Sequence, residues 1–326
     1  MAAVSVHVPV MAKEVVEIYE GFTGTGSEAV FVDATLGAGG HALAVLEGFP
    51  RASLVAFDQD SDARSLASGR LSLYGGRVRV VPENFRGIAR LATEEGWRGA
   101  SGILFDLGVS NMQLSVPGRG FSFQDDGPLD MRMDRDGGSI TAEEFIATRG
   151  APELARVFRE YGEERYAYQI AKALVRARER GESPATTGEF TALIRRTLPA
   201  PVQRKMGGHP ARRVFQALRI AVNSELEALS EGLDGAITVA GQMGVIVVIS
   251  YHSLEDRIVK RRFLQWSAEG RGMVLMKRPL VPGSDEIEAN RSARSAKLRA
   301  FVKGQPASKG KDARRHGQGE STLGKA

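Results

Sequence analysis

The N-terminal third of the chain alternates short apolar runs with longer amphipathic segments. The runs at 29–33, 53–58, 77–81 and 102–106 are rich in β-branched residues and are flanked by Gly, Asp or Pro. Helical stretches separate them, so the pattern predicts strands joined by right-handed helical crossovers in a mostly parallel sheet. A further apolar run at 244–250 predicts a fifth buried strand.

The segment between the fourth and fifth predicted strands, 107–243, is too long to be a loop and must contain structure of its own. Apolar residues recur at helical spacing in 153–180, 187–198 and 211–233. We therefore expect an inserted helical domain. The last of these helices, with Val214 and Leu218 on one face, is expected to belong to the sheet domain again.

This pattern divides the chain into three parts. An α/β domain covers 1–110 and 214–302, the inserted helical domain covers 111–213, and a basic tail covers 303–326. The runs at 273–277 and 297–302 can add two edge strands to the sheet. The tail is rich in Gly and Lys without periodicity, which predicts disorder.

Composition narrows the classes of function. The 326 residues include no cysteine, which excludes disulfides, thiolate metal sites, iron–sulfur clusters and a cysteine nucleophile. No membrane-spanning run and no signal peptide are found, so we expect a cytoplasmic protein. Most of the net charge of +5 comes from the tail, which leaves the arginine-rich segment 149–219 as the candidate surface for nucleic acid.

Three aspartates close predicted strands. Asp33, Asp58 and Asp106 each follow an apolar run, and the carboxyl ends of parallel strands meet at one edge of a sheet. We therefore expect these carboxylates to gather at that edge, where ligands of such folds bind. Phe85 and Asp106, after the third and fourth strands, are the next candidates for contacts with a cofactor. The alternatives are that Phe85 is a core residue and that Asp106 caps a turn.

A glycine cluster follows the first strand and indicates a ligand at the strand ends. Gly37, Gly39 and Gly40 allow a tight turn and a close approach of the backbone, although a turn without any ligand would need the same residues. Asp58, about 20 residues further on, can accept both hydroxyls of a ribose. The glycine spacing departs from the dinucleotide fingerprint. It therefore favours S-adenosylmethionine, with a nicotinamide-dependent oxidoreductase as the second hypothesis.

The segment that follows the fourth strand faces the reactive end of such a cofactor. Its polar side chains are Asp106, Ser110, Asn111 and Gln113. Methylation of an exocyclic amine requires acceptors for the amine hydrogens, and Asp106 is our first choice, ahead of the backbone carbonyls of the next two residues. The lack of cysteine excludes carbon-5 methylation of a pyrimidine through a cysteine adduct and excludes radical methylation.

Two further segments carry candidate substrate contacts. His252, after the fifth strand, is either a proton acceptor or a member of a strand-end hydrogen-bond network, and Arg257 on the following helix is either a phosphate contact or a solvated residue. Phe121 and Phe123 can form the walls around a base taken out of its stack, or belong to an ordered lid. The arginine-rich helices add Arg212 and Arg213.

Long motifs in the chain resemble one known family, the bacterial ribosomal RNA small-subunit methyltransferase H (MraW type). The resemblance runs from His7 to Phe301 through "DATLGAGGHA", "FDQD", "FDLGVS", "RGFSF", "GPLDMRMD", "YGEERYA", "HPARRVFQALRIAVNSEL", "SYHSLEDRIVK" and "RSARSAKLRAF". It departs from the family pattern at Asn111, where a serine is more usual, and this leaves the fine positioning of the substrate open.

The resemblance implies a class I, Rossmann-like methyltransferase that modifies N4 of a cytidine in the decoding centre of 16S rRNA, in the small ribosomal subunit. It assigns contacts with S-adenosylmethionine to Gly39, Gly40, His41, Asp58, Phe85, Asp106 and Gln113. No metal is expected, and the oligomeric state stays open. A ribosome-assembly factor that binds RNA without catalysis is the third hypothesis.

Overall fold

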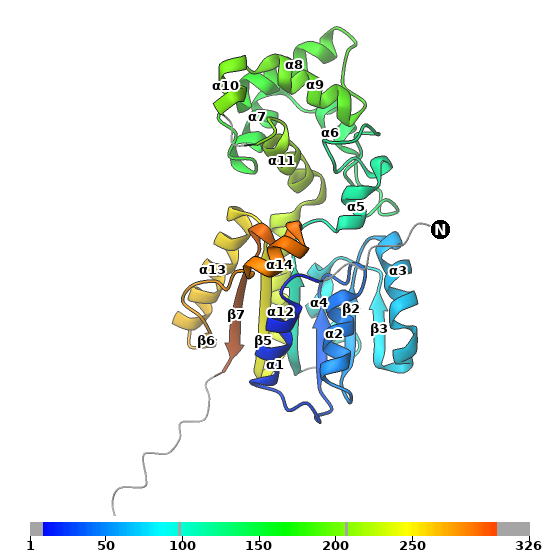
Figure 1. Cartoon of the computed structure of the whole chain (residues 1–326), viewed down its shortest axis with the longest axis vertical. Coiled ribbons are helices and arrows are strands. Elements are labelled where there is room, and N and C mark those ends of the chain that lie inside the picture. The colour runs from blue at the N-terminus through cyan, green and yellow to red at the C-terminus, as the bar shows by residue number, and fades with distance from the viewer. Residues whose placement is uncertain (1–8, 97–98, 206–207, 305–326) are drawn as a thin grey trace, which may run out of the picture.

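A computed structural model describes residues 9–96, 99–205 and 208–304 (Figure 1). The predicted α/β class is confirmed by a seven-stranded sheet within these residues, in the order β3-β2-β1-β4-β5-β7-β6. The strands are β1 (Val30–Asp33), β2 (Ser53–Phe57), β3 (Val78–Val81), β4 (Ala100–Asp106), β5 (Ala240–Ser250), β6 (Gly272–Val274) and β7 (Lys297–Lys303).

Strands β1 to β5 are mutually parallel, as predicted, whereas β7 is antiparallel to both β5 and β6. The two C-terminal strands were expected at edges, but β7 lies inside the sheet and only β6 is an edge strand. The physical reason is that the backbone of β7 pairs along both of its edges, with β5 on one side and with β6 on the other.

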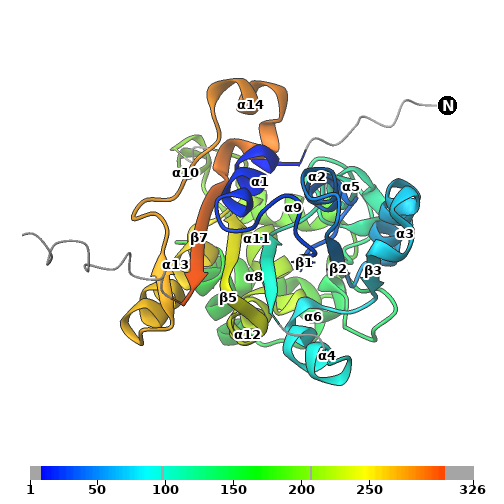
Figure 2. The same ribbon diagram turned by 90° about the horizontal axis from the view of Figure 1, so that it is seen from below.

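Helices cover both faces of the sheet (Figure 2). One face packs against α1 (Ala12–Glu20), α2 (Gly40–Gly48) and α3 (Ser61–Leu71). The other packs against α4 (Ile88–Glu94), α12 (Glu225–Val239) and α13 (Ser253–Ala268). The short elements between them are η1 (Ser72–Arg77), η2 (Phe85–Gly87), α5 (Asn111–Ser115), η3 (Pro117–Arg119), α14 (Ser284–Ala289) and η4 (Arg291–Ser295).

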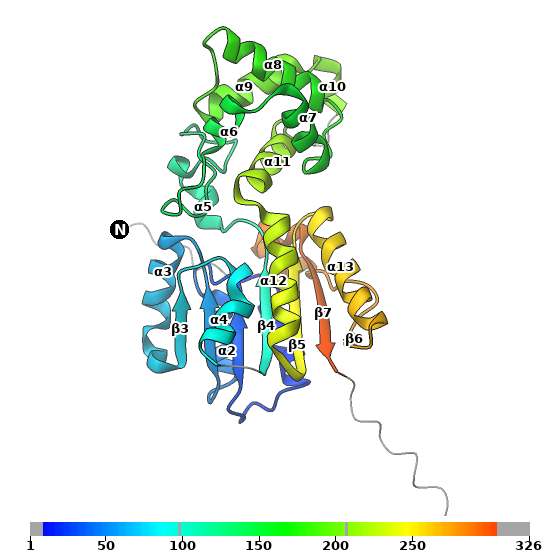
Figure 3. The same cartoon turned by 180° about the vertical axis from the view of Figure 1, so that it is seen from behind.

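Between β4 and β5 the chain forms a second layer of helices, which stands on the carboxyl edge of the sheet (Figure 3). We call α6 to α11 the helical unit. It has a hydrophobic core of its own, separate from the two cores that flank the sheet. Its helices are α6 (Ala142–Thr148), α7 (Ala151–Glu160), α8 (Ala167–Glu179), α9 (Thr187–Thr197), α10 (Ala200–Lys205) and α11 (Arg212–Asn223).

The end of the helical unit differs from the prediction. The segment 211–233 was expected to be one helix on the sheet, but it breaks at Ser224, whose φ of 48° is left-handed. Before the break, Val214, Leu218 and Val222 are buried in the core of the helical unit. The expected boundary at 213 was therefore wrong, and only α12 packs on the sheet. The segment 153–180 likewise divides into α7 and α8.

Two further predictions concern membrane-spanning helices and the C-terminal tail. Among the helices that the structure describes, none is both long enough and apolar enough to cross a membrane. The predicted disorder of 303–326 concerns residues that, after Gly304, lie outside the described part of the chain.

Candidate active site

A cavity of about 1450 Å³ lies between the carboxyl edge of the sheet and the helical unit. Its wall contains residues from the loops after β1, β2, β3, β4 and β5 and from the first turn of α11. Two of the predicted site residues, Gly39 and Arg257, do not line it. The predicted residues that do line it are Gly40, His41, Asp58, Phe85, Asp106, Ser110, Asn111, Gln113, Phe121, Phe123, Arg212, Arg213 and His252.

The glycine turn after β1 is held tightly against its neighbours. Gly37 and Gly39 have φ values of 52° and 79°, the left-handed region that glycine adopts without strain. A Cβ on Gly39 would lie 3.3 Å from Cβ of Ala67 on α3, and a Cβ on Gly40 would lie 3.1 Å from Cβ of Pro9. Gly39 therefore packs the turn against α3, while Gly40 brings its backbone to the cavity.

Asp58, at the end of β2, is fixed by two backbone donors. Its Oδ2 accepts the N–H of Gly37 at 2.8 Å, and its Oδ1 accepts the N–H of Asp60 at 2.9 Å. Burial raises the pKa of Asp58 to about 6, in spite of these two hydrogen bonds. The carboxylate lines the cavity directly beside the glycine turn, and each of its oxygens has a second lone pair for a ligand.

His41 lies in the cavity wall with both ring nitrogens buried and without a hydrogen bond. Its Nε2 is 3.4 Å from Oδ2 of Asp106. Burial opposes protonation, but the neighbouring carboxylates of Asp106 and Asp33 outweigh it and raise the pKa of His41. Burial also raises the pKa of Asp33, to about 6. A buried nitrogen without any partner usually indicates a missing ligand, so Nδ1 of His41 fits a site for a polar cofactor.

Asp106, at the end of β4, is held by residues from the two neighbouring strands. Its Oδ1 accepts the hydroxyl hydrogen of Tyr251 at 2.7 Å, and its backbone N–H donates to Oγ1 of Thr35 at 2.7 Å. The sequence assigned no role to Tyr251. A signal was present, because Tyr251 directly follows β5, the strand that pairs with β4.

A buried ion pair ties the segment after β4 to the start of α3. Arg119 and Asp60 are each only 2% exposed, and both terminal nitrogens of the guanidinium donate to the carboxylate, at 2.7 and 3.1 Å. Gln113 donates from Nε2 to Asp60 Oδ2 at 2.7 Å. Its Oε1 accepts the N–H of Ser110 at 3.0 Å, so both ends of the amide are bound by the protein itself. Sequence reasoning found neither Arg119 nor Asp60.

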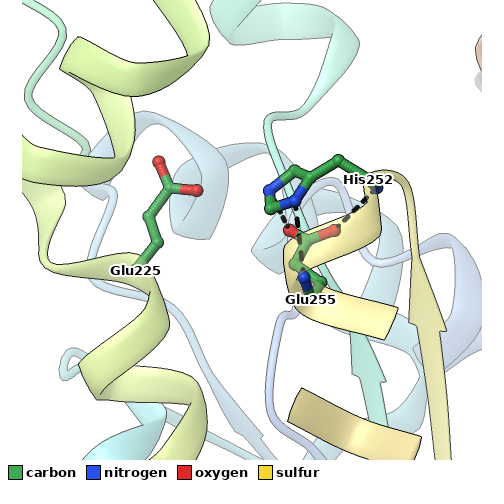
Figure 4. Close-up of side chains that lie close together, drawn as sticks. All are labelled: Glu225, His252 and Glu255. Carbon is green, nitrogen blue, oxygen red and sulfur yellow. Dashed lines mark hydrogen bonds and ion pairs between the residues drawn. The ribbon is translucent and has the colours of Figure 1, made fainter. Parts of the chain in front are cut away.

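His252 caps the N-terminus of α13 (Figure 4). Its Nδ1 accepts the N–H of Glu255 at 3.4 Å, and its Nε2 lies 3.1 Å from Glu255 Oε1. The pKa of Glu255 is lowered although burial opposes this, because His252 and Arg219 lie nearby. Both ring nitrogens of His252 thus face Glu255.

Glu225 completes a cluster with His252 and Glu255 in which one ligand atom from each lies within 4.8 Å of the others. Imidazole and carboxylates are donors that metal ions accept. Here, however, Arg219 forms a bidentate pair with Glu225, with both distances 2.8 Å, and Glu255 Oε2 accepts the N–H of Tyr251. The guanidinium of Arg219 therefore balances the negative charge of the carboxylates in this cluster.

The upper wall of the cavity belongs to the helical unit and the segment before it. Phe123 is half-buried and stacks on His209, with ring centroids 4.7 Å apart and an angle of 10° between the rings. Phe121 is 6% exposed and belongs largely to the helical core, so Phe123 offers the larger aromatic surface. Arg257, outside the wall, pairs with Glu163 at 3.2 Å.

Comparisons with known proteins agree with this geometry. The model of the MraW methylase family matches residues 4–304. A ribosomal RNA small subunit methyltransferase H of Carboxydothermus hydrogenoformans is 46% identical over 314 residues, which cover 91% of this chain and 97% of that protein. The protein of the same name from Mycolicibacterium smegmatis is 48% identical over 261 residues, which cover 79% of this chain and 69% of that protein.

Among solved structures, a putative rRNA methylase from Clostridium thermocellum has a TM-score of 0.43 and 11% identity, and the match covers 91% of this chain and all of that one. At this level the structural likeness adds nothing to the assignment. The family match extends over both parts of the sheet and the whole helical unit, and it includes every strand whose carboxyl end borders the cavity. The chain therefore belongs to the MraW methylase family.

Proposed function

We propose that this protein transfers a methyl group from S-adenosylmethionine to N4 of a cytidine in the RNA of the small ribosomal subunit. The names of the relatives support the substrate, and the family supports methyl transfer. The observation that carries the proposal is the carboxylate of Asp106, which lines the cavity and is oriented by Tyr251. A ribosomal substrate also favours a cytoplasmic protein.

The cofactor would lie across the ends of β1, β2 and β4. Asp58 would accept the ribose hydroxyls, the backbone of Gly40 would border the cofactor, and the unpartnered Nδ1 of His41 would receive one of its polar groups. S-adenosylmethionine supplies an electrophilic methyl group on a sulfonium. The edge-to-face contact of Phe85 with Phe105, with centroids 5.4 Å apart, fixes one apolar wall of this site.

The cavity has room for the target nucleotide beside the cofactor. Its volume of about 1450 Å³ exceeds the roughly 300–1,000 Å³ of ordinary ligand pockets. A base taken out of its stack needs an aromatic or apolar wall and polar partners. Phe123 would provide the wall, and Ser110 and Asn111 the partners. We therefore assign cofactor binding to the sheet and RNA recognition to the helical unit.

Asp106 would accept the hydrogens of the cytidine amino group. Its hydrogen bonds would draw the nitrogen lone pair out of the ring and toward the methyl carbon, and hold the two reacting atoms in line. When the amine takes the methyl group that the sulfonium would supply, it would lose one proton to Asp106 or to water. His252 is the weaker candidate, because both of its ring nitrogens face Glu255.

The test uses labelled S-adenosylmethionine and small ribosomal subunits that lack modifications. After incubation the RNA is digested to nucleosides, which are separated and identified by mass spectrometry. The proposal predicts label in N4-methylcytidine, and no binding of NAD to the protein. Label in ribosomal protein, or in a cytidine methylated at another atom, would contradict it. Cofactor binding without any transfer would favour an RNA-binding assembly factor.

A further inference from the structure

The cavity wall carries two arginines on the side opposite the helical unit. Arg291 and Arg294 belong to η4 and line the cavity with exposed side chains. Within the described part of the chain, the side chain of neither residue forms an ion pair or a hydrogen bond. Other exposed arginines do, as in the pairs Arg90–Glu94 and Arg180–Glu182.

The backbone that carries these arginines is firmly anchored. Ala293 and Ala296 are 0% and 2% exposed and belong to the core on one face of the sheet. The preceding helix, α14, is fixed to the N-terminal segment, because Glu286 Oε1 accepts the N–H of Met11 at 2.7 Å. Figure 1 shows α14 at the sheet edge that faces the helical unit. The guanidinium groups therefore start from a rigid base, which reduces the entropy lost when they bind.

The acidic residues of α14 and the arginines of η4 lie on different sides of this segment. The acidic residues of α14 do not line the cavity, whereas the arginines of η4 do. On the opposite wall, Arg212 at the start of α11 is also exposed and, within the described residues, also without a partner. Cationic side chains thus border the cavity on both sides, with Glu163 as well as Arg212 on the second wall. The carboxylates of Asp58 and Asp106 lie at the strand ends.

We infer that Arg291 and Arg294 bind phosphate groups of the RNA strand that carries the target nucleotide. Guanidinium groups bind phosphate oxygens through paired hydrogen bonds, and such contacts position a strand without reading its sequence. The RNA strand would cross the cavity between η4 and Arg212, with the target base pointing toward Asp106. This inference rests on the proposed function, because it takes RNA as the substrate.

The test measures RNA binding separately from methyl transfer. The affinity of the full chain for a fluorescently labelled single-stranded RNA is followed by anisotropy over a range of salt concentrations. The test variant is the double substitution Arg291→Gln/Arg294→Gln. The matched control is Lys277→Gln/Arg278→Gln, which removes the same charge from exposed positions nearby in sequence that do not line the cavity.

The inference predicts that the Arg291→Gln/Arg294→Gln protein binds RNA about tenfold more weakly, and that the slope of log affinity against log salt falls by about 1.4. The control should match the unaltered protein, and Arg291→Lys/Arg294→Lys should retain most of the slope. Unchanged binding by the Gln variant overturns the inference. An equal fall of the salt slope in the Gln and Lys variants also overturns it, since charge would then not be the cause.

The proposed function can fail independently of this inference. If the unaltered protein transfers no methyl group to small subunits but the Gln variant still loses RNA affinity, the inference stands and the proposed reaction does not. If transfer occurs and RNA affinity is unchanged in the Gln variant, the reaction stands and η4 has no part in binding the strand.

Discussion

Asp106 is the residue on which the proposed chemistry depends, and its surroundings determine how its carboxylate is used. Tyr251 donates to Oδ1, so that oxygen is fixed in direction, and Oδ2 lies 3.4 Å from His41. Burial and the nearby Asp106 both raise the pKa of Tyr251 well above its usual value. Tyr251 therefore keeps its proton and acts as a permanent donor that orients Asp106.

The substitution Tyr251→Phe removes this donor and keeps the ring. A hydrogen bond to a charged group contributes about 1.5–3 kcal/mol, so kcat should fall by roughly 10- to 100-fold while KM for the cofactor and for the RNA stays the same. The control is Tyr168→Phe, an exposed tyrosine on α8. Steady-state kinetics check the prediction, and a rise in KM with unchanged kcat would show that Tyr251 does not position Asp106 for the reaction.

The raised pKa of Asp58 predicts a pH dependence of cofactor binding. Because burial raises this pKa to about 6, the carboxyl is protonated in the free protein below that pH and accepts the ribose hydroxyls less well. Affinity for S-adenosylmethionine should therefore fall as the pH drops through about 6. Calorimetric titrations measure this, and Asp58→Asn should bind weakly with less dependence on pH. Asp136→Asn, at an exposed position that does not line the cavity, is the control.

Two buried aspartates, Asp33 and Asp58, make the stability of the free protein depend on pH. The pKa values of Asp33 and Asp58 are raised in the folded state, so the stability that their protonated forms provide is present at low pH and is lost as the pH rises through about 6. For cofactor binding, an affinity of the unaltered protein that stays constant across this pH range would contradict the assignment of Asp58.

At the scale of elements, the ion pair of Arg119 and Asp60 joins η3 to the start of α3 and so fixes the loop that follows β4. Arg119 also donates to the backbone carbonyls of Arg132 and Met133, at 3.1 and 3.2 Å. One guanidinium therefore connects three segments of chain that border the cavity. The sequence could not show this, because the partners lie far apart and the spacing has no periodicity.

The substitution Arg119→Met leaves Asp60 buried without its partner. Removing one member of a buried pair destabilises a protein by about 3–5 kcal/mol. The exposed pair of Arg51 and Glu28 is the control, and Arg51→Met should change the free energy of unfolding by at most about 1 kcal/mol. Urea denaturation measures both. Similar small changes in the two variants would mean that the Arg119–Asp60 pair does not stabilise the fold.

Most elements of the sheet could be predicted from sequence because their signals are local. An apolar run closed by an aspartate marks β1 and β4, and in β2 the aspartate directly follows the strand. The break at Ser224 could not be predicted, since a serine with left-handed φ has no distinctive pattern and the apolar periodicity continues through it. Periodicity shows that a helix buries one face and does not show against which core, so α11 was assigned to the wrong unit.

At the scale of the whole molecule, the cavity lies between two units with separate cores. The contacts that join them include the hydrogen bond from the hydroxyl of Tyr161 to Glu227, at 3.1 Å, and the exposed pair of Arg257 and Glu163. Most of the site residues predicted from the sequence line one cavity, because the carboxyl ends of parallel strands converge. The roles of Tyr251, Arg119 and η4 could not be predicted from the sequence, because they depend on how distant segments pack.

Because the sheet domain and the helical unit have separate cores, we expect the cofactor to change amide hydrogen exchange in one and not in the other. At a concentration about 100 times Kd, S-adenosylmethionine should slow amide hydrogen exchange in β1, β2 and β4 by up to roughly 100-fold, because it stabilises the unit that binds it. Exchange in the buried turns of α7, α8 and α9 should not change, since these helices contribute no proposed cofactor contact. Mass spectrometry measures the exchange, with NAD as the control ligand. Equal protection of both units would show that they open as one.

The most direct test of the account is the single-turnover rate of methyl transfer by Asp106→Asn, measured on unmodified small subunits with saturating cofactor. The amide keeps the size of the side chain and removes its charge. We predict a rate about 10²- to 10⁴-fold lower than that of the unaltered protein, as expected when an acceptor of protons in the transition state is lost. A rate within threefold of the unaltered protein would contradict the role of Asp106 and with it the proposed chemistry of the cavity.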